Sequence, residues 1–179
     1  LGTAEYRPYV RRHPETNKPC YHPWHWRGWW DFGTGALGDM ACHIMDPANW
    51  ALKLENPTSI EPLILENKTE DQAPVRSKTK YEFGARGDMP ACTVYWYEGG
   101  LMPDRPADIP ADEPLGDGNN GSLFIGTEGH ATCGEYGGNP RLLRAEKMAD
   151  YTMPDPSIPR VPGNSPYEDW FRACRGGPA

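Results

Sequence analysis

The sequence of 179 residues has little of what several large protein classes require. No apolar run approaches the ~20 residues of a transmembrane helix, so the sequence predicts a soluble protein. Its 18 lysines and arginines are outnumbered by 25 aspartates and glutamates, which gives a net charge of −7. A chain with this balance has no extended surface that neutralises phosphates. We therefore expect neither nucleic acid nor a membrane as a partner.

The cysteines do not indicate a disulfide framework. There are five, they are widely spaced, and no two of them form a C-x-x-C pair. Neither a disulfide scaffold nor a zinc site is indicated, and buried thiols are the simpler interpretation. The segment His22-Pro23-Trp24-His25 resembles half of a metal site, but no third and fourth ligands lie at a spacing that would complete it. We therefore expect no metal.

Glycine and proline are abundant, with 20 of each, and leave few places for long helices. Apolar residues recur at helical spacing only from about 36 to 54, and Pro47 is expected to distort or split that helix. Alternating patterns then predict strands at 59–65, 79–83, 91–97, 122–125 and 130–133. Hairpins are predicted at 84–90 and 126–129, so that Arg86-Gly87-Asp88 is interpreted as a turn rather than as a cell-adhesion tripeptide.

These elements predict an α+β fold in which an open, mostly antiparallel sheet carries helices on one face. The strand at 91–97 has large side chains on both faces, so we expect both faces of the sheet to be covered. The helix covers one face, and a second subunit is predicted to cover the other, through Tyr95 and Tyr97 or alternatively through Val94 and Trp96. At this length we expect one domain over 1–179, and both ends of the sequence indicate a piece of a longer protein.

The most informative stretch runs from Gly33 to Asp46. Asp39, His43 and Asp46 follow one another at i, i+4 and i+7 and therefore line one stripe of a helix. Carboxylates beside an imidazole can orient the ring and tune its pKa, which is the basis of a proton-transfer site. The simpler interpretation is an acid near the start of a helix beside a histidine with a structural role.

The same stretch reads G-x-G-x-x-G from Gly33 to Gly38, which is also found in dinucleotide-binding loops. Three observations argue against that alternative. Asp39 directly follows the third glycine, where a pyrophosphate would have to bind and would be repelled. The preceding aromatic segment is not a buried parallel strand, and the repeated strand-helix-strand units of such a sheet are missing. We therefore expect no cofactor-binding residue in this chain.

Residues 26–54, with the core Gly-Thr-Gly-Ala-Leu-Gly-Asp-x-x-x-His-x-x-Asp, closely resemble the C-terminal domain of the glucose-fructose oxidoreductase / inositol dehydrogenase / MocA (Gfo/Idh/MocA) family. Residues 95–100 and 133–138 look like a bacterial branch of it. The resemblance implies a C-terminal domain like that of dihydrodipicolinate reductase, which supplies substrate contacts and the oligomer interface. In that family NAD or NADP is bound mainly by an N-terminal Rossmann domain, which this chain lacks.

The family's D-x-x-x-H pattern falls on Asp39 and His43. The resemblance therefore implies that His43 is the catalytic acid/base at the oxidised hydroxyl and that Asp39 helps to position the sugar. The family's catalytic lysine lies in a Glu-Lys-Pro motif of the nucleotide domain and has no counterpart here. The isolated chain is accordingly expected to be inactive and to need no cofactor of its own.

Four neighbouring residues are predicted to form the sugar-facing wall, because aromatic faces stack on the C–H surfaces of pyranoses and arginine holds hydroxyls. These substrate-binding candidates are Trp24, His25, Trp26 and Arg27, together with Asp46 from the helix. The predicted function is that of the substrate-binding and assembly domain of an NAD(P)-dependent sugar or polyol oxidoreductase that forms a homo-oligomer. The alternatives are a non-catalytic carbohydrate-binding or scaffold module and an NAD-dependent glycosidase of the same family.

Overall fold

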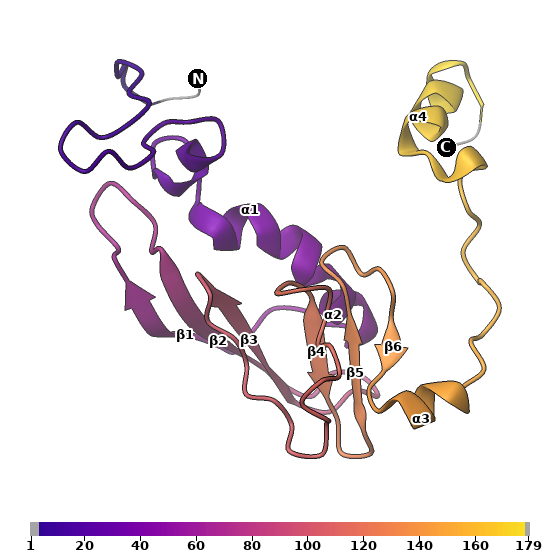
Figure 1. Cartoon of the computed structure of the whole chain (residues 1–179). Coiled ribbons are helices and arrows are strands. Elements are labelled where there is room, and N and C mark those ends of the chain that lie inside the picture. The colour runs from indigo at the N-terminus through magenta and orange to yellow at the C-terminus, as the bar shows by residue number, and fades with distance from the viewer. Residues whose placement is uncertain (1–3, 178–179) are drawn as a thin grey trace. The chain divides into compact units, whose positions relative to one another are not determined.

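The computed structural model describes residues 4–177 and has an α+β fold (Figure 1). The chain forms two compact units that divide after Met148. In chain order the elements are η1 (His25–Gly28), α1 (Gly35–Ile44), α2 (Asp46–Ala51), β1 (Ser59–Glu66), β2 (Arg76–Phe83), β3 (Cys92–Glu98), β4 (Ser122–Ile125), β5 (His130–Cys133), β6 (Arg141–Leu142), α3 (Ala145–Ala149), η2 (Pro162–Asn164) and α4 (Pro166–Cys174). No helix within the described residues is both long and apolar enough to cross a membrane.

The predicted helix is present and is broken in two, as the proline indicated. Helix α1 ends at Ile44, and α2 begins at Asp46 with Pro47 in its first turn. Proline fits this position because the first N–H groups of a helix have no intrahelical partner, whereas inside a continuous helix it would remove a bond and clash with the preceding turn. Met45 joins the two helices without a side-chain cap.

The strands form two antiparallel sheets of three strands each, with the orders β1-β2-β3 and β4-β5-β6. The antiparallel α+β architecture is thus confirmed, although the strands are divided between two small sheets rather than joined in one. Strands β4 and β5 have the predicted bounds, and β2 begins three residues earlier than predicted, at Arg76 rather than 79. Strand β6 was not predicted, because two residues are too few to show an alternating pattern.

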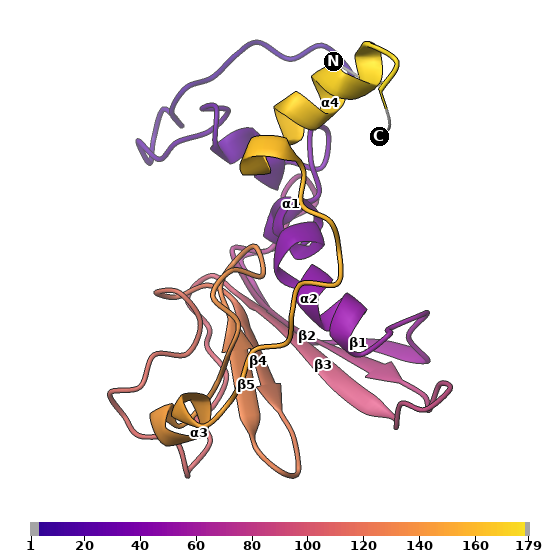
Figure 2. The same cartoon turned by 90° about the vertical axis from the view of Figure 1, so that its right-hand side faces the viewer.

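One face of the β1-β2-β3 sheet packs against the helices. Phe83 and Trp96 lie on this face with exposed fractions of 6% and 5%, and α1 and α2 face the same side (Figure 2). Register places Tyr95 and Tyr97 on the opposite face, where the Nζ atom of Lys78 lies 5.1 and 5.0 Å from the two ring centroids. Of the two residue pairs predicted to contact a second subunit, Tyr95 and Tyr97 therefore lie on the face that the helices leave uncovered.

The β4-β5-β6 sheet is centred on a buried threonine. The Thr132 hydroxyl is 1% exposed, donates to the Ser122 carbonyl at 2.9 Å and accepts from the Gly116 amide at 2.9 Å. These bonds join β5 to its neighbour and to the long preceding loop. Leu143, which directly follows β6, is completely buried, and its amide donates to the His130 carbonyl of β5 at 2.9 Å.

The hairpin between β2 and β3 is held by Arg86. Its guanidinium donates to the carbonyls of Leu52 and Lys53, just beyond α2, and to the carbonyls of Gly84 and Pro90 within the hairpin. Asp88 of the same hairpin pairs with Lys53 at 2.8 Å. Arg86 and Asp88 are therefore engaged within the chain, as expected for a turn.

The smaller unit contains a short amphipathic helix. Helix α4 starts at a cap in which the Ser165 hydroxyl accepts from the Glu168 amide at 3.3 Å. This serine-x-x-glutamate arrangement is a common helix start. Its apolar residues recur at i, i+3, i+4 and i+7, namely Tyr167, Trp170, Phe171 and Cys174.

Tyr81 lies on the helix-covered face of the first sheet, and we predict that it limits stability at alkaline pH. Burial raises the pKa of Tyr81, and the nearby Glu98 carboxylate raises it further. Because the folded-state pKa is raised, the neutral phenol favours folding below its ordinary value of about 10, and this stability is lost as the pH rises through the folded value. Tyr81→Phe should therefore lose less stability above pH 10 than the parent, measured by urea denaturation from pH 8 to 11. Identical alkaline profiles would contradict the prediction.

Candidate functional site

The predicted wall residues and the predicted catalytic helix are joined by one arginine. The Arg27 guanidinium donates to the Asp39 carboxylate in α1 and lies 3.9 Å from the ring centroid of Trp24. A guanidinium that is both paired with a carboxylate and stacked on an indole is held in one orientation. Trp24, Arg27 and Asp39 thus form a cluster that fixes η1 beside α1.

This packing depends on three glycines that the sequence arranges as G-x-G-x-x-G. A Cβ at Gly33 would lie 2.6 Å from the Cα of Arg27, and one at Gly35 would lie 2.6 Å from the Cβ of Ala73. Gly35 also has a φ of +73°, and a Cβ at Gly38 would overlap the Thr34 side chain. Each glycine is therefore required by a close approach within the chain.

The three glycines have a structural reason that does not involve a dinucleotide. A side chain at Gly33, Gly35 or Gly38 would meet Arg27, Ala73 or Thr34, respectively. One part of the sequence argument needs correction, since α1 begins at Gly35 and Asp39 lies in its second turn rather than at its N-terminus. The charge of Asp39 is therefore a weaker objection to phosphate binding than its position directly after the third glycine indicated.

His43 lies one helical turn beyond Asp39 and has a different neighbour. Its exposed ring stands edge-on to Tyr136, with ring centroids 5.1 Å apart and planes inclined by 67°. No hydrogen bond or ion pair within residues 4–177 joins His43 to Asp39 or Asp46. Tyr136 was not among the predicted site residues. The only sequence signal for it was the Gly-Glu-Tyr-Gly-Gly segment at 134–138.

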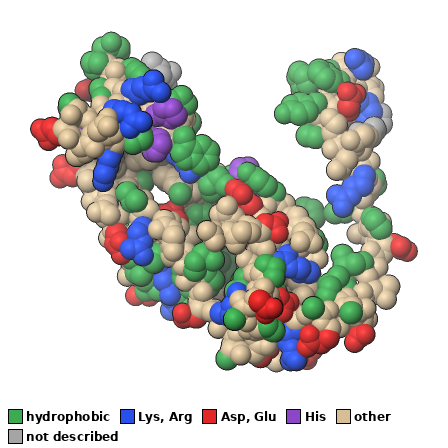
Figure 3. All heavy atoms as spheres, viewed as in Figure 1, with side chains coloured by type: hydrophobic (Ala, Val, Ile, Leu, Met, Phe, Trp, Pro, Cys, Tyr) green, Lys and Arg blue, Asp and Glu red, His purple; other side chains and the backbone are tan. Residues whose placement is uncertain are grey.

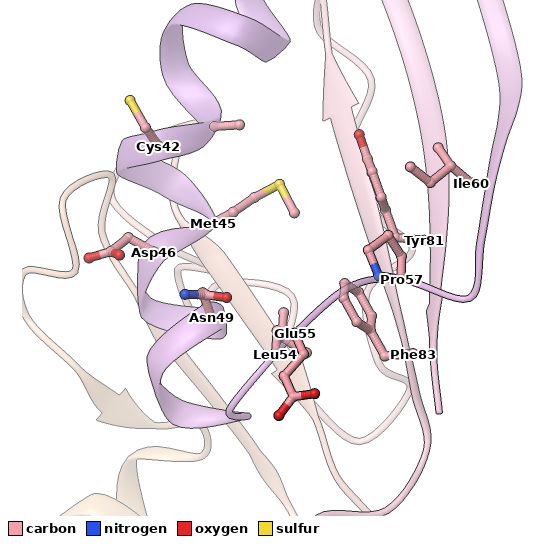
Figure 4. Close-up of a pocket in the computed structure, with 11 residues that line it drawn as sticks. Cys42, Met45, Asp46, Asn49, Leu54, Glu55, Pro57, Ile60, Tyr81 and Phe83 are labelled. Atoms are coloured by element: carbon pink, nitrogen blue, oxygen red, sulfur yellow. The ribbon is translucent and has the colours of Figure 1, made fainter. Parts of the chain in front are cut away.

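Asp46 is the first residue of α2, beyond the junction at Met45. It lines a largely apolar pocket of about 530 Å³ between the helices and the first sheet (Figure 4). Cys42, Met45, Tyr81 and Phe83 are among the other residues around this pocket. The part of Asp46 in substrate binding stays a prediction.

The remaining wall candidates are exposed on the N-terminal part of the chain, where Figure 3 shows basic, histidine and hydrophobic side chains close together. Trp24 is 60% exposed and Trp26 is 45% exposed. The His25 ring lies 5.9 Å from that of His22. Within the described residues, histidines, cysteines and carboxylates form no group of three or more that could hold a metal ion.

Comparison with known families agrees with the resemblance seen in the sequence. Residues 1–87 match the model described as "Oxidoreductase family, C-terminal alpha/beta domain". This segment contains Trp24, Arg27 and Asp39, helices α1 and α2, and the first two strands of the first sheet, β1 and β2. No curated protein matches the chain in a sequence comparison.

Two neighbouring glycines provide a test of the packing around Arg27. Gly33→Ala places a methyl group against the Arg27 backbone, and we expect a loss of about 1–3 kcal/mol in the free energy of unfolding. Gly28→Ala is the matched control, because a Cβ there meets nothing within 4 Å. It should change stability by less than about 1 kcal/mol. Urea denaturation of both variants measures the difference, and equal losses would contradict the assignment.

Proposed function

Because residues 1–87 of this chain belong to an oxidoreductase family as its C-terminal alpha/beta domain, we propose that the chain is the substrate-binding and assembly domain of an NAD(P)-dependent sugar or polyol oxidoreductase. The observation that carries this proposal is the arrangement of α1, which presents Asp39 beside Arg27 and Trp24 and presents His43 one turn further on. The nicotinamide cofactor would be held outside this chain, and the packing of each glycine in the G-x-G-x-x-G segment against its own chain supports this.

The Arg27 cluster has the chemistry of a polyol site. The face of Trp24 suits the C–H surface of a sugar ring, and it is exposed. The Asp39 carboxylate has acceptor positions beyond those used by Arg27 and can accept hydrogen bonds from sugar hydroxyls. Arg27 is itself committed to Asp39 and Trp24, so its main role is to orient these two groups.

His43 is the group of this chain that is suited to move a proton. A neutral imidazole nitrogen can accept the proton of a substrate hydroxyl when the other nitrogen carries hydrogen. His43 is exposed and forms no hydrogen bond within the described residues, which leaves both ring nitrogens accessible to a ligand. Asp39 and His43, one turn apart on the same face, can then contact neighbouring hydroxyls of one substrate.

Substitution of His43 tests the catalytic part of the proposal. In the intact oxidoreductase that contains this chain, His43→Ala should lower kcat by roughly 10²–10⁴, the usual contribution of a positioned acid/base. Asp39→Asn weakens the pairing with Arg27 and should mainly raise KM, with a smaller loss in kcat. Steady-state kinetics over a panel of sugars and polyols measures both effects.

The control for charge removal is Asp88→Asn, which breaks the surface pair with Lys53 far along the sequence from the cluster. It should leave kcat and KM unchanged. If His43→Ala and Asp39→Asn both keep full activity with every substrate of the parent, the Asp39/His43 pair is structural. A carbohydrate-binding or scaffold module would then be the better interpretation of this chain.

For assembly, we propose that the uncovered face of the first sheet contacts a second copy of the chain. Tyr95 is 44% exposed there, and its ring centroid lies 6.3 Å from that of Tyr97. Exposed aromatic patches of this kind commonly mark interaction surfaces. Lys78 and Lys80 lie on the same face, so an interface there combines aromatic contact with charged groups.

Light scattering over a range of concentrations tests the assembly surface. We expect a mass above the 20.0 kDa of one chain. Tyr95→Lys adds a third positive charge beside Lys78 and Lys80 and should shift the mass toward that of the monomer. Ile125→Lys changes an exposed apolar residue on the other sheet and should not. A monomeric parent, or equal effects of the two variants, would rule out this face.

A further inference from the structure

Tyr136 is placed beside His43 without being part of a hydrophobic core. It is 70% exposed, although its ring centroid lies 5.1 Å from that of the histidine. A large aromatic side chain gains most from burial, so burial does not explain why this one is held at the surface. Its well-defined neighbour in the structure is His43, the residue with the proposed proton-transfer role.

The backbone around Tyr136 is a tight turn that fixes where its ring can go. The Gly137 amide donates to the Gly134 carbonyl at 3.0 Å, and the Gly134 amide donates to the Gly138 carbonyl at 2.8 Å. Gly137 has a φ of +72°, a conformation that other residues rarely adopt. Two backbone bonds across five residues leave the turn little freedom.

The second sheet, whose strand β5 leads into this turn, is attached to the helices beside His43. The Ser122 hydroxyl in β4 donates to the carbonyl of Ile44, the residue after His43, at 2.5 Å. A Cβ on Gly137 would lie 3.2 Å from the Cγ of Pro47, so the turn approaches α2 closely. The second sheet is therefore held against the junction of α1 and α2, which fixes Tyr136 relative to His43.

We propose that Tyr136 is a positioning residue of the Asp39/His43 site: it holds the His43 imidazole in one rotamer and forms the wall of the site at that end. Trp24 stands at the other end, above Arg27 and Asp39. Between the two ends, Asp39 and His43 are four residues apart in one helix, about 6 Å along its axis, so they can contact neighbouring hydroxyls of a single sugar ring. This inference rests on the proposed function, because it gives Tyr136 its part in the same reaction.

The expected effect follows from the freedom of an exposed histidine. Without the neighbouring ring, His43 would distribute over its staggered χ1 rotamers, and only one of them presents the imidazole correctly. Tyr136→Leu should therefore lower kcat by roughly three- to tenfold and raise KM. Tyr136→Phe keeps the ring and should retain the parent values. Because Tyr136 is largely exposed, neither change leaves a cavity.

The test has a spectroscopic part that uses the chain itself. NMR of the His43 side chain reports its rotamer through three-bond couplings and its aromatic neighbour through ring-current shifts. We expect one rotamer in the parent and in Tyr136→Phe, and rotamer averaging with altered ring-proton shifts in Tyr136→Leu. Tyr6→Leu changes another highly exposed tyrosine and is the control, which should leave the His43 signals unchanged.

The kinetic part uses the intact oxidoreductase and separates this inference from the proposed function. If Tyr136→Leu leaves both the His43 signals and the kinetics unchanged while His43→Ala abolishes activity, the positioning role is wrong and the function stands. If His43→Ala retains full activity, the proposed function fails, and Tyr136 has no catalytic partner to position. Reduced kcat in Tyr136→Leu, with rescue in Tyr136→Phe, supports the inference.

Discussion

The contact between Arg27 and Asp39 is the charged link between the aromatic N-terminal segment and α1. It acts together with the close approach of Gly33 to the Arg27 backbone, which brings η1 against the same helix. The Arg27 side chain is 19% exposed, so part of its hydration has been replaced by Asp39 and by the face of Trp24. Loss of Asp39 would leave this partly buried guanidinium without its counterion, which is costly for a charge with reduced hydration. Gly33 allows the approach because any side chain there would meet the Arg27 backbone.

The elements that the sequence predicts well are those with a local cause. Pro47 indicated the break between α1 and α2, and the Gly126–Gly129 turn indicated the β4–β5 hairpin. The division into two sheets had no such signal, because it depends on which strands pair rather than on whether a segment is extended. The proximity of His43 and Tyr136 was equally inaccessible, since residues so far apart in sequence show no periodic relation.

The candidate site illustrates the same division between local and long-range information. Helical spacing correctly placed Asp39 and His43 one turn apart, because both lie within α1. Asp46 belongs to the next helix, α2, and lines the pocket beside the first sheet, so its part in substrate binding stays a prediction. The G-x-G-x-x-G pattern was ambiguous from sequence alone. Its physical meaning became clear only when each glycine could be assigned a neighbour that excludes a Cβ.

Arg86 shows how distant parts of the chain come to share one stability. Helix α2 is short and has no glycine stop, and the carbonyls that follow it are satisfied by a guanidinium 34 and 33 residues away in sequence. The helix end and the β2–β3 hairpin are therefore expected to open together rather than to fray independently. Amide hydrogen exchange would then detect a single cooperative unit made of a helix terminus and a hairpin, and thermal motion at the hairpin would reach the pocket-lining side of α2 and, through Pro47, the helix junction beneath the proposed site.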